Sequence, residues 1–141
     1  MTAAYATPIL ISVVDDDASV RKTTKLLIES FGYRAVVFES AETFLKSGQL
    51  NDTSCLVVDV QMQGMNGLQL QSHLASEGCS IPIIFISAYG NKEYRRQAMQ
   101  GGAIAFLDKP FRDEKLLKNI RSALKQAKDR TKTNLTIESL R

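Results

Sequence analysis

Three consecutive carboxylates, Asp15, Asp16 and Asp17, follow the apolar run ILISVV (9–14) without a break. Two carboxylates about 4 Å apart repel each other by roughly 4 kcal/mol at the effective dielectric of a protein surface. Such a cluster therefore needs screening water or a neighbouring cation. A fourth acid, Asp59, interrupts the apolar run LVVDV, where an ionised side chain facing the core would be expensive. We expect Asp59 to point out of the core, and Asp17 to cap the following helix.

The elements that position these acids alternate between short apolar runs and segments with helical spacing. The strand candidates are residues 9–14, 34–38, 54–60, 81–87 and 103–107. The helix start signals are Asp17, Ser40, Asn66 and Asn91, and the stop signals are Gly32, Gly78 and Gly101–Gly102. Runs that are apolar on both faces are typical of a parallel sheet covered by helices. The predicted fold class is α/β: a doubly wound (βα)5 three-layer sandwich.

Polar residues fall at the carboxyl ends of four predicted strands, where right-handed crossovers bring all strand ends to one edge and ligands bind. They are Asp15, Asp16, Asp59, Ser87 and Lys109. Carboxylate oxygens suit Mg²⁺, which keeps several waters and completes its shell with phosphate oxygens, and Mn²⁺ accepts similar ligands. A carboxylate beside Mg²⁺ can attack phosphorus and form an aspartyl phosphate. The acids are therefore predicted to hold a divalent cation.

A family resemblance rests on motifs in a fixed order: VVDDD (13–17), LVVDVQM (56–62), FISA (85–88) and FLDKPF (106–111). Together they resemble the receiver domain of bacterial two-component response regulators of the FixJ/NarL type. The resemblance covers about residues 8–127. It implies a flavodoxin-like parallel sheet of strand order 2-1-3-4-5. It also implies a cytoplasmic signalling protein that is not an enzyme, apart from catalysing its own phosphorylation and dephosphorylation.

The resemblance implies roles for the acidic residues. Asp59 matches the phosphoacceptor, which takes its phosphoryl group from a sensor histidine kinase in a Mg²⁺-dependent reaction. Asp16, Asp59 and the backbone carbonyl of Gln61 match the metal ligands. Asp15 matches the second acidic position, which usually holds the metal through water.

The resemblance also covers the phosphate-binding and switch residues. Ser87 and Lys109 match the hydroxyl and the ammonium group that bind the phosphoryl group. Phe106 matches the aromatic switch, which in the family turns inward as the hydroxyl residue moves toward the phosphoryl group. The Lys109–Pro110 bond matches one that the family commonly holds cis.

Some positions depart from the family pattern. Gln63 replaces a frequent proline, which should leave the loop after the phosphoacceptor looser because φ is no longer restricted. Phe106 stands where many members have tyrosine, so its ring can respond only by packing. Tyr89, two residues beyond Ser87, flanks the path by which water would attack the phosphoryl group. We expect its bulk to slow autodephosphorylation.

Composition and charge set further bounds. The chain of 141 residues is the size of one domain, and 44% apolar with 23% charged residues is an ordinary globular balance. No apolar stretch has the length of a membrane span or the basic leader of a signal peptide. The two cysteines, Cys55 and Cys79, have no metal-binding spacing and favour free thiols, with a redox bridge between them as an alternative. Residues 112–141 hold 9 Lys/Arg against 4 Asp/Glu, so the basic character lies at the C-terminal end.

The C-terminal end of the chain also bears residues that we expect to contact partners. The last helix is predicted to end near residue 127, and the polar segment 128–141 to be a flexible linker or tail. In the family, the fourth helix, the fifth strand and the fifth helix often form a homodimer surface. Nothing in this chain reads nucleic acid. Two versions of the function stay open: the receiver half of a transcriptional regulator whose DNA-binding domain is absent here, or a stand-alone receiver acting by protein contacts.

Two alternatives from other classes also exist. Asp15-x-Asp17 satisfies the first motif of haloacid dehalogenase-like phosphatases, with Asp15 as nucleophile, although only Asp108 lies near the position of that family's late acidic pair. A flavodoxin-type flavin site would place the flavin phosphate against three acids, which would repel it.

Overall fold

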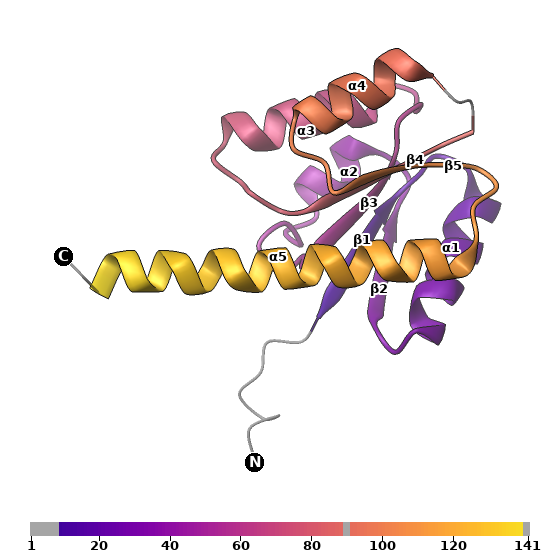
Figure 1. Cartoon of the computed structure of the whole chain (residues 1–141). Helices are drawn as coiled ribbons and strands as arrows, with labels where there is room; N and C mark the ends of the chain where they lie inside the picture. Colours follow the sequence, from indigo (N-terminus) through magenta and orange to yellow (C-terminus); the bar gives the residue numbers. More distant parts are fainter. Residues whose placement is uncertain (1–8, 89–90, 140–141) are drawn as a thin grey trace.

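The computed structural model describes residues 9–88 and 91–139, together with the side chains of those residues up to 127 (Figure 1). Five strands and five helices alternate along this part of the chain. The strands are β1 (Leu10–Val14), β2 (Arg34–Phe38), β3 (Cys55–Asp59), β4 (Ile83–Ser87) and β5 (Ala105–Asp108). The helices are α1 (Ala18–Ser30), α2 (Ala41–Lys46), α3 (Gly67–Ser76), α4 (Lys92–Gln100) and α5 (Asp113–Ser139).

The strands form one parallel sheet of order β2-β1-β3-β4-β5, which confirms the predicted topology. Every residue of β1, β3 and β4 is buried, as their uninterrupted apolar runs predict, whereas the edge strands β2 and β5 are partly exposed. Pro82 has no N–H to donate, and β4 begins only at the following residue, Ile83.

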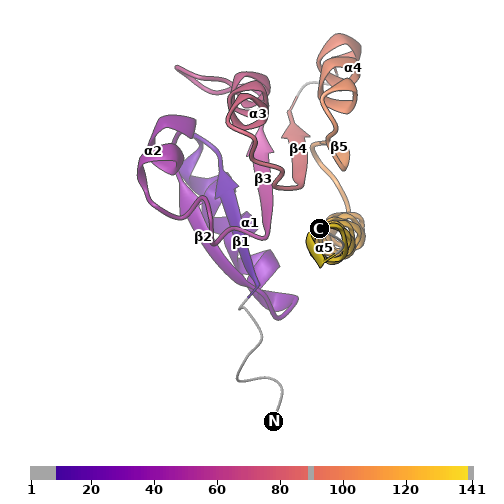
Figure 2. The ribbon, with the colours of Figure 1, turned by 90° about the vertical axis from the view of Figure 1, so that its left-hand side faces the viewer.

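Helices cover both faces of the sheet. Figures 1 and 2 show α1 and α5 on one face and α2, α3 and α4 on the other. Alternate residues of β3 serve the two layers: Val57 packs in the cluster with Ile28 of α1 and Leu116 of α5, whereas Val58 packs in the cluster with Phe44 of α2. Full burial of side chains of this size stabilises the fold by roughly 1.5–3 kcal/mol each. The core therefore makes the sheet a rigid base for the loops at its edges.

The predicted helix starts are confirmed in detail. Asp17, Ser40, Asn66 and Asn91 are N-caps, and each side chain accepts a hydrogen bond from a backbone N–H of the first turn. Asn66 and Gln69 complete a reciprocal capping box at the start of α3. The caps satisfy helix ends that lie beside loops of the carboxyl edge and so define where those loops end.

The last helix is longer than its sequence pattern predicts. We expected it to end near residue 127, but α5 spans 27 residues and ends at Ser139. The flexible linker or tail over 128–141 stays a prediction. Residues 128–139 contain neither proline nor glycine, so nothing in the backbone chemistry interrupts the helix. Its last turns extend past the sheet (Figure 1). The predicted end of the apolar stripe did not mark the end of the helix.

A polar contact joins α3 to α4. The buried Gln71 amide donates a 2.9 Å hydrogen bond to the carbonyl of Ala98. The approach leaves no room for a side chain at Gly101, because a Cβ there would lie 2.6 Å from the Gln71 amide carbon. This contact holds the C-terminal end of α4.

Gly101→Ala should therefore destabilise the protein by about 1–3 kcal/mol, the usual cost of overpacking. The backbone at this position is compatible with alanine, since its φ is -77°. Urea denaturation followed by circular dichroism measures the change in the free energy of unfolding. The cost should shrink in a Gln71→Ala background, where the clash is removed, and an equal cost in both backgrounds would contradict the steric explanation.

Candidate functional site

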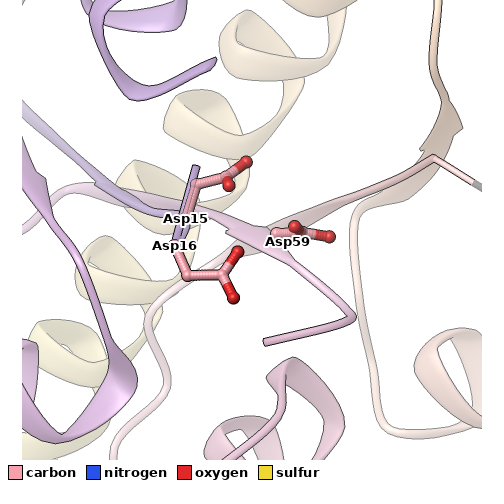
Figure 3. Close-up of side chains that lie close together, drawn as sticks. All are labelled: Asp15, Asp16 and Asp59. Atoms are coloured by element: carbon pink, nitrogen blue, oxygen red, sulfur yellow. The ribbon is translucent and has the colours of Figure 1, made fainter. Parts of the chain in front are cut away.

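Three carboxylates meet at the carboxyl edge of two neighbouring strands. Asp15 and Asp16 follow β1, and Asp59 ends β3, which pairs with β1 so that Val14 lies opposite Val58. One oxygen from each of the three side chains lies within 4.8 Å of the others (Figure 3). The parallel pairing thus brings together acids that are more than 40 residues apart in the chain, as predicted.

Asp15 is completely buried, and its two carboxylate oxygens have different partners. Oδ1 accepts a 2.9 Å hydrogen bond from the backbone N–H of Asp17, and Oδ2 lies 3.3 Å from the Lys109 ammonium nitrogen. Its main-chain carbonyl accepts a 2.9 Å hydrogen bond from the Arg21 guanidinium. A buried charge is tolerated when it is paired and hydrogen-bonded, and Asp15 meets both conditions.

Asp59 is 8% exposed and is less well compensated than Asp15. Its Oδ1 accepts a 3.2 Å hydrogen bond from the backbone N–H of Gln61, and its Oδ2 lies 4.0 Å from the Lys109 nitrogen. Burial, followed by the charge of Asp15, raises the pKa of Asp59 to about 6, although Lys109 and the Gln61 N–H act in the opposite direction. Ionisation of Asp59 is therefore less favourable than that of a solvent-exposed carboxyl group.

Asp16 is exposed and connects the acids to the loop after β3, where its Oδ2 accepts a 3.3 Å hydrogen bond from the backbone N–H of Gln63. The same loop is held a second time by Glu42 of α2, whose Oε2 accepts a 3.0 Å hydrogen bond from the N–H of Met65. This bond lowers the pKa of Glu42. Gly64 has φ +74° and would place a Cβ 2.7 Å from Glu42 Oε2, so the turn and the close approach both require glycine.

The hydrogen bonds that Asp16 and Glu42 accept restrain the loop that we expected Gln63 to loosen. A free φ at Gln63 is countered by hydrogen bonds on either side of Gly64. The loop lines a hollow of about 390 Å³ beside Asp16, bounded by Asp16, Val60, Gln61, Met62, Gln63, Asn66 and Tyr94. Gln61 therefore lies next to the acids, as its predicted role requires. The sequence carried no signal for Glu42, whose partner belongs to a different element.

The Ser87 hydroxyl and the Lys109 ammonium group are positioned by β4 and β5, which lie on the other side of β3 from β1. Ser87 ends β4 and is fully buried, and Lys109 directly follows β5. The backbone N–H of Lys109 donates a 2.7 Å hydrogen bond to the carbonyl of Ser87, and the Lys109–Pro110 peptide bond is cis. All five polar residues predicted for the edge thus occupy the ends of adjacent strands.

The ring of Phe106 is buried in this structure. It is 4% exposed, and its centroid lies 6.3 Å from that of Phe85. The Arg95 guanidinium carbon of α4 lies 4.9 Å from the ring centroid. Arg95 was not singled out from the sequence, because a lone basic residue on an exposed helix face carries no signal. Tyr89, for which we predicted an effect on dephosphorylation, lies outside the described residues.

The chemistry of the donor set fits a hard divalent cation. Among the described residues, the ion-pairing partner of these three carboxylates is Lys109, so their negative charge is only partly balanced by the side chains that the structure describes. Oxygen ligands of this kind are those preferred by Mg²⁺ and Mn²⁺. The site can therefore attract a cation and, through it, a phosphorylated group.

The sequence also matches a known protein family. A family model described as the response regulator receiver domain matches residues 11–121. The chain belongs to the response regulator receiver family. Receiver domains act in two-component signalling, so membership implies a histidine kinase as partner. The assignment also disfavours the phosphatase alternative, whose second motif residue, Asp17, is here the N-cap of α1.

Individual relatives agree with this assignment. The receiver is 40% identical over 136 residues to nodulation protein W of Bradyrhizobium diazoefficiens, covering 96% of this chain and 60% of that protein. It is 47% identical over 119 residues to response regulator protein TmoT of Ectopseudomonas mendocina, covering 84% of this chain and 54% of that protein. The receiver therefore spans about half to three fifths of the length of these relatives.

Solved structures place the receiver in the same fold. The structure of response regulator StyR superposes with a TM-score of 0.86 at 39% identity, covering 96% of this chain and 68% of that one. FixJ-N gives a TM-score of 0.77 at 30% identity, covering 85% of this chain and 96% of that one.

The remaining sequence expectations concern thiols and membranes. Cys55 and Cys79 are both free, and burial raises the pKa of the Cys55 thiol to about 12. A thiol of this kind is unreactive. None of the helices in the described part of the receiver combines the length and the apolar character that a membrane span requires.

The charge of Asp59 should appear in the pH dependence of stability. Because burial raises the pKa of Asp59 from 3.8 to about 6, the native state of the metal-free protein binds this proton more tightly than the unfolded state does. Through Asp59 alone, the free energy of unfolding should fall as the pH rises from about 4 to about 6 and stay low above that range. At pH ~7.5, Asp59→Asn should raise it by about 2 kcal/mol, and at pH ~4 the gain should vanish.

Urea denaturation in the presence of a chelator measures this difference. Asp52→Asn, a change in an exposed residue outside the site, is the control and should show no such pH-dependent gain. An Asp59→Asn variant that is less stable than the wild type at neutral pH would contradict the electrostatic account.

The contact between Glu42 and Met65 predicts local protection of the loop. Glu42→Ala removes the acceptor, so hydrogen exchange at the Met65 amide should become about fivefold faster or more. Residue-resolved exchange by NMR measures it. Glu39→Ala removes an exposed acid three residues earlier and should leave the Met65 rate unchanged. Equal rates in both variants would show that the loop does not depend on Glu42.

Proposed function

We propose that Asp59 accepts a phosphoryl group from a sensor histidine kinase, with Mg²⁺ held by Asp15, Asp16, Asp59 and the backbone carbonyl of Gln61. The observation that carries this proposal is the convergence of three carboxylates from β1 and β3 with Lys109 at one edge of the sheet. Asp15 would act at longer range, through water, because both of its oxygens already have protein partners.

The reaction is a transfer between two nucleophiles. An oxygen of Asp59 attacks phosphorus, a P–O bond forms, and the P–N bond of the donor phosphohistidine breaks. The departing imidazole keeps the electron pair and takes a proton. When bound, Mg²⁺ or Mn²⁺ would neutralise charge on the phosphoryl oxygens. The protein's own contribution is positioning, together with the positive charge of Lys109.

Asp59 suits the nucleophilic role because its charge is less closely compensated than that of Asp15, the other buried acid of the cluster. Asp15 is tied to Lys109 at 3.3 Å, whereas Asp59 lies 4.0 Å from the same nitrogen. After transfer, Lys109 would balance the new phosphoryl charge, and the Ser87 hydroxyl would donate a hydrogen bond to a phosphoryl oxygen. Transfer would thus turn a repulsive cluster into one with a covalent anion held by fixed cationic and polar groups.

The output follows from the neighbouring switch residues. Ser87 and Phe106 would respond to the phosphoryl group, and the response would change the surface formed by α4, β5 and α5. We infer that this surface supports a homodimer. The chain catalyses only its own phosphorylation and dephosphorylation in this scheme and turns over no external substrate.

The length of the relatives favours one version of the output. The matched segments cover only 60% and 54% of the two relatives described above, and another relative, TdiR of Thauera aromatica, is called a transcriptional regulatory protein. We infer that the receiver of residues 8–127 controls a DNA-binding output through the segment 128–141, whose described part continues α5. Such a protein would act in the cytoplasm, where its kinase donor and its DNA target are both accessible. The receiver itself would make no specific contact with nucleic acid.

The decisive experiment is intact mass spectrometry after incubation with Mg²⁺ and a small phosphodonor. The wild type should gain the mass of one phosphoryl group, and Asp59→Asn should gain none. Asp16→Ala should reduce the gain by at least tenfold at limiting Mg²⁺, because it removes a metal ligand. Asp52→Asn is the control and should be phosphorylated like the wild type. A mass gain that survives Asp59→Asn would overturn the site assignment.

A further inference from the structure

Arg95 makes three contacts with β5 from the neighbouring helix α4. Its Nη1 donates a 3.0 Å hydrogen bond to the carbonyl of Phe106, and its Nη2 donates a 2.6 Å hydrogen bond to Oδ2 of Asp108. Its guanidinium carbon lies 4.9 Å from the centroid of the Phe106 ring. A single side chain thus contacts the backbone and the ring of Phe106 and the side chain of Asp108, which ends the strand before Lys109.

The planar shape of the guanidinium allows Arg95 to make these three contacts at the same time. β5 is the outer strand of the sheet, so its outward carbonyls have no partner strand, and the Phe106 carbonyl is satisfied by Arg95. A planar group with several donors can hold a carbonyl and a carboxylate while it lies over an aromatic ring, which a lysine ammonium cannot do. The three contacts therefore specify arginine rather than any positive charge.

The ion pair by itself explains little. Arg95 and Asp108 are both 46% exposed, and exposed pairs of this kind contribute weakly to stability. The ring beneath the guanidinium, in contrast, is 4% exposed. The contact is thus better placed to select the position of the Phe106 ring than to stabilise the fold.

We propose that Arg95 is a positioning residue that holds the Phe106 ring in its buried position and couples α4 to the phosphate-binding end of β5. The coupling to signalling rests on the function proposed above, in which Phe106 is the switch. The hold on the ring rests on the contacts alone.

The chain connections explain why such a coupling reaches the site. Ser87 ends β4 a few residues before Asn91 caps α4, and Lys109 follows Asp108 directly. Figures 1 and 2 show α4 beside β5 at the edge of the sheet. A shift of Ser87 or Lys109 toward a phosphoryl group moves one of the two elements that Arg95 joins. By thermodynamic linkage, a contact that favours the buried ring also favours the phosphoryl-bound state if that state requires the buried ring.

Arg96 provides a matched control on the same helix. It pairs with Glu93 and donates a hydrogen bond to Gln100, and both partners belong to α4. Arg96→Gln removes the same charge, one residue away, without removing a contact to β5. A difference between Arg95→Gln and Arg96→Gln therefore reports the contacts to β5 and not the net charge of the helix.

The first measurement is the solvent exposure of the Phe106 ring in the metal-free protein. Fluorine NMR of protein labelled with 4-fluorophenylalanine gives a resonance for this ring, assigned with Phe106→Leu, and its shift between H₂O and D₂O reports exposure. Arg95→Gln should increase this isotope shift, and Arg96→Gln should match the wild type. Thermal unfolding by circular dichroism, with similar midpoints for the two variants, separates ring position from general destabilisation.

The second measurement is the affinity for beryllofluoride with Mg²⁺, a stand-in for the phosphoryl group, by titration calorimetry. Arg95→Gln should bind about fivefold more weakly than the wild type, and Arg96→Gln within about twofold. Arg95→Lys keeps the positive charge but loses the several N–H donors of the planar guanidinium. Its affinity for beryllofluoride should lie between those of Arg95→Gln and Arg96→Gln. It also carries the test if Arg95→Gln does not fold.

The outcomes separate this inference from the proposed function. A wild type that does not bind beryllofluoride contradicts the proposed function, while the ring measurement still decides the hold of Arg95. A wild type that binds it, with the same ring exposure and affinity in Arg95→Gln and Arg96→Gln, overturns the inference about Arg95 and leaves the phosphoacceptor intact.

Discussion

The repulsion between two buried carboxylates, Asp15 and Asp59, is the constraint on which the site depends. Burial of Asp59, and after it the charge of Asp15, raises the pKa of Asp59, so the two ionised side chains are close together at a cost. Lys109 compensates Asp15 more closely than Asp59. The remaining imbalance makes Asp59 the less compensated of these two acids, in agreement with the phosphoacceptor role proposed for it.

Only a parallel sheet with a well-packed interior can maintain this arrangement. The fully buried strands β1, β3 and β4 hold the loop ends at fixed spacings, and the acids lie on the first and second of these strands while Ser87 lies on the third. Protein interiors are close-packed and deform little, so the cost of repulsion cannot be relieved by separating the strands. The stability of the core thus supports a destabilised site.

The helix α4 is held in a different way from the rest of the domain. Ala98 is its one fully buried residue among those described, so apolar packing contributes little to its position. Two polar contacts compensate, at different points along the helix: Gln71 binds the carbonyl of Ala98, and Arg95 binds β5. An element held by a few polar contacts can shift at a lower cost than one held by a continuous core. This suits α4 to carry a response away from the site.

Much of this protein could be read directly from local sequence. Short apolar runs and capping residues such as Asp17 and Asn66 predicted the elements, because strand burial and helix capping depend on neighbouring residues. The predicted parallel sheet then implied that the acids, Ser87 and Lys109 would lie at one edge, and the strand order was implied by the family resemblance. The helix end predicted near residue 127 was wrong, because the end of an apolar stripe does not by itself interrupt helical hydrogen bonding.

The tertiary structure alone decided the long-range polar contacts. The roles of Glu42, Gln71 and Arg95 depend on how one helix lies against a loop, a helix or a strand far away in the chain, and each side chain is of an ordinary type for an exposed helix. A hydrogen bond forms only within a few tenths of an ångström and a limited range of angles, so spacing in sequence cannot foretell it. The sequence alone thus determined the elements and the charges that meet at the sheet edge, while three-dimensional packing determined which groups restrain them.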